Sequence, residues 1–204
     1  MWEYLLAGLF FGITGGLTPG PLLTLVVSET LKYGKRAGLK IALAPLFTDT
    51  PIVIVILLLV AKVTSITLLA GIISLCGGFF LIYLGLESLK FRADRLQLST
   101  NVPRSLLKGV ITNFLNPSPY IFWFTIGAPI ILKASAVHTG FAVAFLSSMY
   151  LCLVGSKVTV ALLLDRSRSF LSSTAYTWII RGLGIILLLF AVYFFWEGII
   201  KISL

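Results

Sequence analysis

Six long apolar segments alternate with short polar segments along the chain. A helix needs about 17–25 mostly apolar residues to cross a bilayer, so each segment is long enough to be a transmembrane helix. The predicted helices cover residues 4–30, 39–61, 65–89, 106–132, 137–164 and 175–200. No segment is left over for a soluble domain. The pattern therefore predicts an all-α polytopic membrane protein with a single domain, 1–204, in which a cytoplasmic loop at 90–105 links a first half, 1–89, to a second half, 106–204.

Two of the apolar segments are interrupted by prolines. The first contains Thr18-Pro19-Gly20-Pro21, and the fourth contains Asn116-Pro117-Ser118-Pro119. Proline lacks a backbone N–H and clashes with the preceding turn, so closely spaced prolines break a helix. At 1.5 Å per residue, Thr18 lies about 20 Å from the start of its helix and Asn116 about 15 Å from the start of its own. Helices 1 and 4 are therefore predicted to be broken near the midplane of the membrane.

The two breaks occupy corresponding positions, in the first span of each half. With three spans per half, the halves enter the membrane in opposite directions, and matching halves then form an inverted repeat, a plan that recurs in secondary transporters. Broken helices are tolerated in a bilayer where they line a cavity, because the freed backbone groups need partners. The alternative is that the two helices are only kinked and that their similarity is accidental.

The composition supports a membrane protein. The chain is 58% hydrophobic and 11% charged, with a mean hydropathy of +1.05, whereas soluble domains are about 25% charged. The N-terminus has no basic residue before its apolar run and carries Glu3, which is atypical of a cleaved signal peptide. The net charge of +9 would suggest nucleic acid as a partner of a soluble protein. Here the basic residues lie in short loops, so the lipid bilayer explains them and no nucleic-acid partner is expected.

The distribution of basic residues predicts the orientation, because cytoplasmic loops of membrane proteins are enriched in Lys and Arg. The odd-numbered loops carry Lys32, Lys35, Arg36, Lys40, Lys90, Arg92, Arg95, Arg104, Lys108, Arg166 and Arg168, and the opposite side carries only Lys62, Lys133 and Lys201. Both termini are therefore expected outside the cell.

Asp49 lies near the centre of the second predicted span. An ionised Asp there costs about 2.5–3.5 kcal/mol on insertion scales, so it needs a partner, a proton or a cavity. A carboxylate whose proton affinity depends on what is bound could couple proton entry to substrate exit. The alternative is a structural Asp whose charge is satisfied by the hydroxyl of Thr48 or Thr50.

Lys157 lies inside the fifth predicted span, about two turns before its cytoplasmic end. Its long side chain could reach the membrane interface. Two other roles remain open, an ion pair with Asp49 and a clamp for the carboxylate of a substrate.

Asn113 and Asn116 flank the second break, and their amides can both donate and accept hydrogen bonds. This suits a zwitterionic ligand, although the same groups could cap the broken helix. No metal site or cofactor is predicted, because Cys76 and Cys152 lie in separate spans without His, Cys or carboxylate clusters around them.

The stretch GGLTPGPLLTLVVSETLKYGKRAGLKIALAPLFTDTPIV resembles the N-terminal signature of the LysE/RhtB family of amino-acid exporters. That signature combines a TPGP break, a short loop with Gly and basic residues (here YGKRAG) and an Asp in the second span. TNFLNPSPYIFWF is similar to the family's fourth-span motif, and the resemblance covers essentially the whole chain. Two features depart from it, since Thr48 stands where the family usually has Gly, and Lys157 is not part of the family pattern.

The resemblance implies a secondary exporter of amino acids or related small amines in the inner membrane of a prokaryote, driven by protons and working by alternating access. The candidate substrate-binding and coupling residues are Thr18, Pro19, Gly20, Pro21, Asp49, Asn113, Asn116, Pro117 and Lys157. A transporter of Na⁺ or another cation with the same plan is the alternative. A homodimer is an option for so small a bundle, and the sequence does not identify the amino acid.

An intramembrane enzyme is not expected, because no catalytic motif falls within the membrane. Ser105-Leu106-Leu107-Lys108 matches a Ser–Lys spacing, but it lies at the cytoplasmic mouth, where Lys108 is explained by the positive-inside bias. Glu29 is interpreted as a helical partner of Lys32, three residues away.

Overall fold

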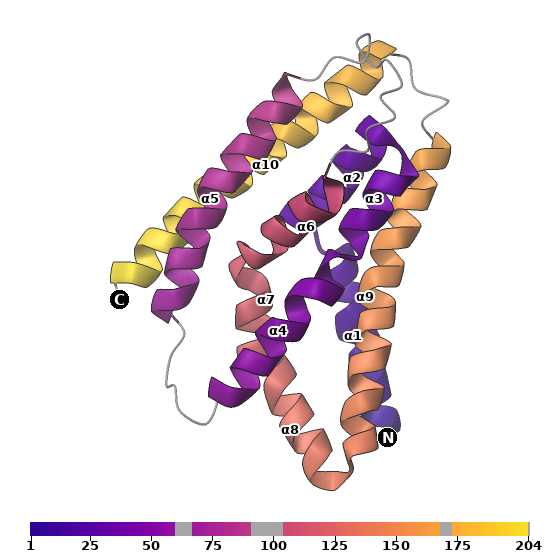
Figure 1. The fold of residues 1–204 in the computed structure, drawn as a ribbon, viewed down its shortest axis with the longest axis vertical. Helices are drawn as coiled ribbons and strands as arrows, with labels where there is room; N and C mark the ends of the chain where they lie inside the picture. Colours follow the sequence, from indigo (N-terminus) through magenta and orange to yellow (C-terminus); the bar gives the residue numbers. More distant parts are fainter. Residues whose placement is uncertain (60–66, 91–103, 168–172, 204) are drawn as a thin grey trace.

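The computed structural model describes residues 1–59, 67–90, 104–167 and 173–203, and all regular structure in these ranges is helical (Figure 1). The elements are α1 (Trp2–Leu17), α2 (Pro21–Tyr33), α3 (Lys35–Ala42), α4 (Ala44–Leu59), α5 (Thr67–Leu89), α6 (Ser105–Phe114), α7 (Pro117–Phe122), the π-helical turn η2 (Trp123–Gly127), α8 (Ala128–Val137), α9 (Thr139–Ser167) and α10 (Ser173–Ser203). Most of the predicted linker at 90–105 and four of the basic residues used for the orientation, Lys62, Arg92, Arg95 and Arg168, lie outside the described residues.

The first predicted break is present. Helix α1 ends at Leu17, α2 begins at Pro21, and the two axes differ in direction by 59°. Gly20 between them is fully extended, with φ −171° and ψ 176°. Proline at position 21 suits the first turn of α2, where its missing N–H would have no acceptor.

The second predicted break is also present. Helix α6 ends at Phe114 and α7 begins at Pro117, with Asn116 in an extended conformation at φ −95° and ψ 122°. The π-helical turn η2 follows, and α8 continues to Val137. The fourth predicted span, 106–132, is therefore a chain of short helices that extends a few residues further than expected.

The described helices include four that are long and apolar enough to cross a membrane, or five when α1 and α2 are counted as one bent span. The four are Lys35–Leu58, Pro117–Val137, Thr139–Arg166 and Thr177–Ile202. In α5 the apolar helix found within the described residues is shorter, Ser74–Leu89. The described residues are thus all-helical with four to five candidate membrane spans, and six spans in two inverted halves stay a prediction.

Two pairs of long helices pack closely along small residues. In the first pair, α1 lies against α9, and a Cβ atom on Gly12 would collide with the Met149 carbonyl, as one on Gly16 would with Ser156 Oγ. In the second pair, α5 lies against α10 (Figure 1), and a Cβ on Gly184 would come within 2.9 Å of the Gly85 carbonyl. Glycine is needed at these positions because the backbones approach so closely.

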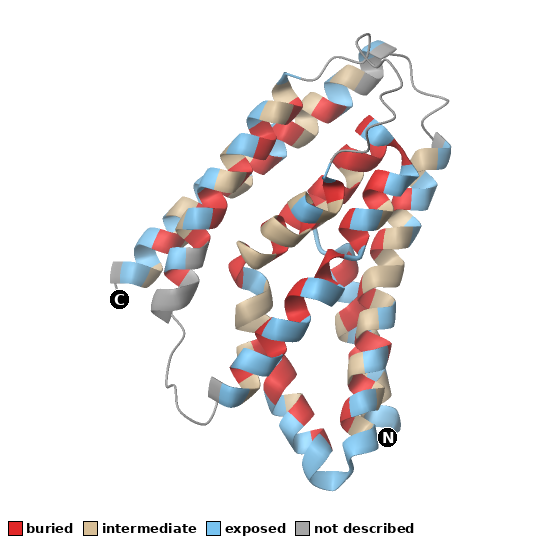
Figure 2. Ribbon diagram, in the orientation of Figure 1, coloured by how far each residue is buried: buried red, intermediate tan, exposed pale blue. Residues whose placement is uncertain are grey.

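Buried residues face the interior of the bundle, and exposed residues lie on its outside (Figure 2). Many of the exposed residues are large and apolar. Leu151, Trp178 and Trp196 are among the most exposed, which is typical of a surface that meets lipid. Two larger apolar cores and a small cluster around Leu31 and Ile180 fill the interior of the described residues. Leu22 and Phe194 belong to one core, and Trp123 and Met149 belong to the other.

Candidate functional site

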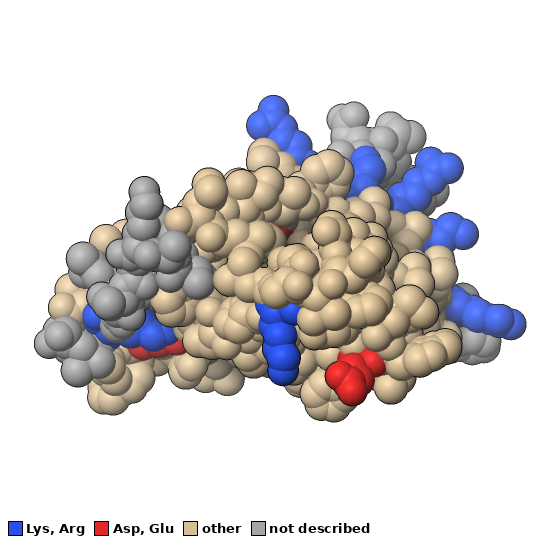
Figure 3. Space-filling view, turned by 90° about the horizontal axis from the view of Figure 1, so that it is seen from below, with Lys and Arg blue, Asp and Glu red and all other residues tan. Residues whose placement is uncertain are grey.

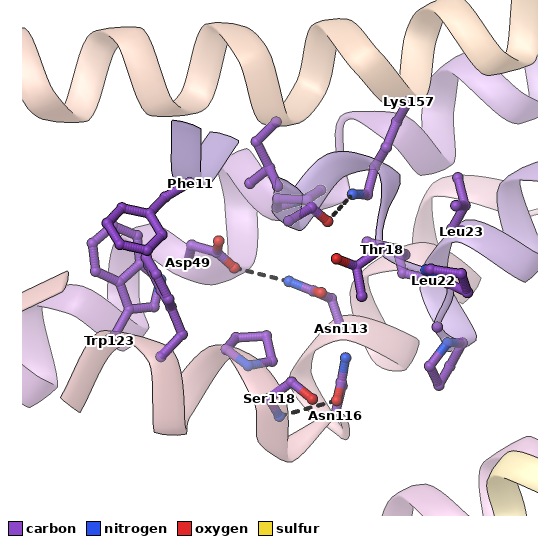
Figure 4. Close-up of a pocket in the computed structure, with 18 of the residues that line it drawn as sticks. Phe11, Thr18, Leu22, Leu23, Asp49, Asn113, Asn116, Ser118, Trp123 and Lys157 are labelled. Atoms are coloured by element: carbon purple, nitrogen blue, oxygen red, sulfur yellow. Dashed lines mark hydrogen bonds between the residues drawn. The ribbon is translucent and has the colours of Figure 1, made fainter. Parts of the chain in front are cut away.

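A cavity of about 370 Å³ lies between the two apolar cores, at the breaks in the helices. Leu22 and Phe194 from one core and Trp123 and Met149 from the other all line it. So do all the predicted site residues except Pro117, which is the buried first residue of α7. Figure 4 shows Asp49, Asn113, Thr18 and Lys157 around the same space, brought together from four different helical segments.

The carbonyl end of α1 is satisfied by an unexpected partner, Lys157. Its ammonium donates 3.1 Å hydrogen bonds to the carbonyls of Gly15 and Gly16 (Figure 4). These carbonyls lie in the last turn of α1. The last carbonyls of a helix have no N–H donor within the helix, and a positive charge near them is favourable. Lys157 therefore closes the break from the side of α1.

Two of the roles predicted for Lys157, reaching the membrane interface and pairing with Asp49, do not describe this arrangement. Its side chain is 3% exposed, so it does not extend to the membrane interface. Among the described residues no ion pair within 4 Å joins it to Asp49, although the two charges act on each other across the cavity. An ammonium has three N–H donors, and the two α1 carbonyls use two of them.

The other side of the first break is open. The N-terminus of α2 has no side-chain cap, and Thr24 is the first residue whose N–H reaches an acceptor before it in the chain, the Gly20 carbonyl at 2.9 Å. Leu22 and Leu23 precede it and line the cavity. The first N–H groups of a helix have no acceptor within the helix, so those of α2 carry a partial positive charge beside the cavity.

The second break is capped by its own side chains. Asn116 Oδ1 accepts a 3.0 Å hydrogen bond from the N–H of Ser118, and Tyr120 donates a 3.0 Å bond to the Phe114 carbonyl. The capping role considered for Asn116 is therefore present in the structure. The two breaks match in sequence pattern, but they differ in what they leave available to a ligand.

Asp49 is held by polar groups from its own helix and from the second half of the chain. Its Oδ1 accepts hydrogen bonds from Asn113 Nδ2 at 2.8 Å and from Thr48 Oγ1 at 3.2 Å. Asn113 Nδ2 also donates to Thr48 Oγ1 at 2.6 Å. The side chain is only 4% exposed, and both bonds end on Oδ1, which leaves Oδ2 for the cavity. Thr48 thus provides the hydroxyl partner that the structural interpretation of Asp49 required.

Aromatic side chains surround the Asp49 end of the cavity. Phe122 packs edge to face on Phe11, with ring centroids 5.6 Å apart, and on Trp123 at 5.2 Å. The buried indole N–H of Trp123 lies close to the Asp49 carboxylate, but the two do not form a hydrogen bond of normal geometry.

The sequence analysis missed the contribution of α10. Phe190, Tyr193 and Phe194 line the cavity from this helix. The last span is apolar almost throughout, so neither periodicity nor a polar residue distinguishes its cavity face from its lipid face.

A cluster of charged residues lies beyond the cavity, where α2, α5 and α6 meet. Lys108 Nζ is 3.2 Å from Glu29 Oε1 and 2.7 Å from Glu87 Oε1. Ser105 donates to Glu29 Oε2 at 3.2 Å, and Lys32 donates to Ser88 at 2.8 Å. Glu29 is 1% exposed, and its bond to Lys108 joins residues 79 positions apart, a partner that the helical pairing with Lys32 did not anticipate. Lys108 is bound to two carboxylates, which opposes a role as the base of a Ser–Lys dyad.

Comparison with known protein families gives one match. A family described as LysE type translocator matches residues 13–198 of the chain. No curated protein and no solved structure matches the chain.

Proposed function

We propose a transport mechanism for this chain, which belongs to the LysE type translocator family. The chain is accordingly a multi-pass membrane protein that exports small molecules, and it is not an enzyme. Our proposal is that it is a secondary active exporter of amino acids or related small amines, coupled to the entry of protons.

Six spans in two inverted halves are part of this proposal, and the helix packing supports them. The first span packs on the fifth through α1 and α9, and the second packs on the fourth through α4 and α6. The third packs on the sixth through α5 and α10. A two-fold operation that exchanges the halves converts the first contact into the second and leaves the third unchanged, as expected for an inverted repeat.

The proposed orientation places both termini outside. In the described part of the chain, the basic residues of the odd-numbered loops lie on the elements that meet at one end of the bundle, at the top of Figure 1. Figure 3 looks at the opposite end, near the N-terminus, where most of the surface is uncharged. This asymmetry is typical of a cytoplasmic and an external face.

The observation that carries the proposal is that two opposite charges, those of Lys157 and Asp49, line one cavity at the helix breaks. The uncapped N-terminus of α2 and the third N–H of Lys157 would bind the carboxylate of an amino acid. Asp49 Oδ2 would accept the ammonium. Asn113 would hold Asp49 in the orientation that this requires.

Coupling is assigned to Asp49 because it is the one acid among the described residues that line the cavity. A substrate ammonium and a proton cannot both be held by the same carboxylate, so loss of one permits binding of the other. The alternative Na⁺ site would draw on carbonyls at the break, but those of Gly15 and Gly16 already accept from Lys157. This use of the two carbonyls supports the choice of protons over a hard cation in the proposal.

Efflux from proteoliposomes tests the proposal. Vesicles with the purified protein are preloaded with a mixture of labelled amino acids and diluted into buffer of equal pH, of lower pH, or of equal pH with added sodium. Faster efflux of one or a few amino acids at lower external pH, absent from protein-free vesicles, is the expected result. Acceleration by sodium alone would replace the proton with sodium, and no efflux under any condition would reject amino-acid export.

A further inference from the structure

We infer that the cavity selects amino acids with uncharged, apolar side chains, an inference that rests on the proposed function and names its substrate class. Three observations support it. They are the balance of charges in the cavity, its apolar walls, and the hydrogen bonds that several of its polar groups already make within the protein.

The charges balance those of a neutral amino acid. The described residues that line the cavity include one acid, Asp49, and one base, Lys157. An amino acid with an uncharged side chain carries one ammonium and one carboxylate, so each of its charges has a partner of opposite sign. A basic amino acid would bring a second cation, and the cavity lining offers it no second carboxylate. Burying such an unpaired charge is strongly unfavourable.

The walls are apolar on two sides. Phe11, Phe122 and Trp123 form one continuous aromatic surface, and Phe190 and Phe194 contribute from α10. The volume of about 370 Å³ lies within the ~300–1,000 Å³ of small-ligand sites, whose lining is mainly apolar with a few placed polar groups. An aliphatic or aromatic side chain would gain from contact with these rings.

Several neutral polar groups of the cavity are already bonded within the protein, whereas Ser118 Oγ and Asn116 Nδ2 make no hydrogen bond to the described residues. Asn113 donates to Asp49 and Thr48, Asn116 accepts from Ser118, and the hydroxyl of Thr18 donates to the Thr14 carbonyl at 2.5 Å. A substrate hydroxyl or amide would have to compete for the bonded groups, which lowers its gain from binding. Polar side chains are therefore expected to bind less well than apolar ones, and charged side chains least well.

The test compares rates in one set of proteoliposomes that contain wild-type protein and equimolar labelled leucine, phenylalanine, lysine, glutamate and threonine. Leucine and phenylalanine are expected to leave at least about 100-fold faster than lysine and glutamate, and about tenfold faster than threonine. Preferred efflux of lysine, glutamate or threonine would overturn the inference on the side chain and leave amino-acid export standing. Efflux of none of the five would reject export itself, and the inference with it.

A matched pair of variants tests the aromatic wall directly. Phe122→Glu adds a carboxylate to the cavity, and Phe122→Gln has nearly the same shape without the charge. The ratio of lysine to leucine efflux is expected to be at least about tenfold higher in the Glu variant than in the Gln variant. Equal ratios in two variants that both retain leucine efflux would overturn the assignment of this wall to the substrate side chain. If either variant fails to fold, the comparison of amino acids in the wild-type protein still decides.

Discussion

The side-chain amide of Asn113 donates a 2.8 Å hydrogen bond to Oδ1 of Asp49, and this bond joins α6 to α4. It connects the segment just before the second helix break with the buried acid of the first half. The same nitrogen donates to Thr48 at 2.6 Å, so both of its N–H groups are used on one helix. The orientation of the carboxylate is therefore set by a residue from the other half of the chain.

Replacing Asn113 with Ala should weaken transport through the orientation of Asp49. The loss of a hydrogen bond to a charged group is worth about 1.5–3 kcal/mol, so kcat/KM for efflux should fall at least about tenfold. Asn116→Ala is the comparison, because Asn116 caps α7 and makes no bond to Asp49. It should lower Tm through the loss of an N-cap, worth about 1 kcal/mol, while the dependence of efflux on the pH gradient persists. A fall in kcat/KM for efflux of equal size in both variants would contradict this division of roles.

Asp49→Asn should abolish coupling and leave the fold intact. The amide oxygen of the new side chain can still accept from Asn113 and Thr48, so the local hydrogen bonds survive. The variant cannot release or bind the coupling proton, and a lower external pH should no longer accelerate efflux. Glu3→Gln, at an exposed site in the first turn of α1, serves as the control and should behave as wild type. Wild-type acceleration in the Asp49 variant would remove this residue from the coupling mechanism.

Lys157→Met should destabilise the protein as well as impair transport. Methionine fills a similar volume but leaves the Gly15 and Gly16 carbonyls without their donor, and a buried unsatisfied group costs about 1–3 kcal/mol. A lower Tm of the purified protein in detergent is the expected result. Lys133→Met is the control, because it removes a positive charge from an exposed position on α8. It should change the free energy of unfolding by less than about 0.5 kcal/mol and so leave Tm almost unchanged. Similar Tm values for the two variants would mean that Lys157 does not hold the end of α1.

The charged cluster should respond unequally to loss of its two main members. Lys108→Met removes the ammonium that contacts the buried Glu29, and breaking a buried ion pair typically costs about 3–5 kcal/mol. Glu29→Gln costs less, because Lys108 keeps its 2.7 Å contact with Glu87. The double variant should be more stable than Lys108→Met alone, since no uncompensated carboxylate remains at position 29. Strictly additive effects in a double-mutant cycle, measured by unfolding in detergent, would mean that the pair is not coupled.

The sequence predicted those features that depend on neighbours along the chain. The prolines at positions 19, 21, 117 and 119 located both breaks, because proline acts on its own helix. The buried Asp49 was likewise identified from its place in an apolar segment. These two signals were enough to place the cavity, and all the predicted site residues except Pro117 line it.

Contacts between distant segments were beyond the sequence. Glu29 was matched to Lys32 within its helix, whereas the structure also brings Lys108 to it from α6. Lys157 was expected to pair with Asp49, to bind a substrate or to reach the membrane interface. Its bond to the end of α1 was missed, because no pattern in one sequence shows that α9 passes that end. The aromatic residues of α10 gave no signal either, since a uniformly apolar helix does not indicate which of its faces is turned inward.

The glycine-lined contacts divide the bundle into parts of unequal stiffness. Along α1 and α9, and along α5 and α10, glycines let the helices approach so closely that a Cβ atom would collide with the partner helix, which leaves little room for one helix to shift against the other. Each helix pair is therefore expected to move as one rigid body. Residues from both pairs line the cavity, Gly15 and Leu153 from α1 and α9 and Phe190 from α10. A path for a solute is then expected to form when the α5–α10 pair tilts away from the α1–α9 pair and from α2, which α10 contacts.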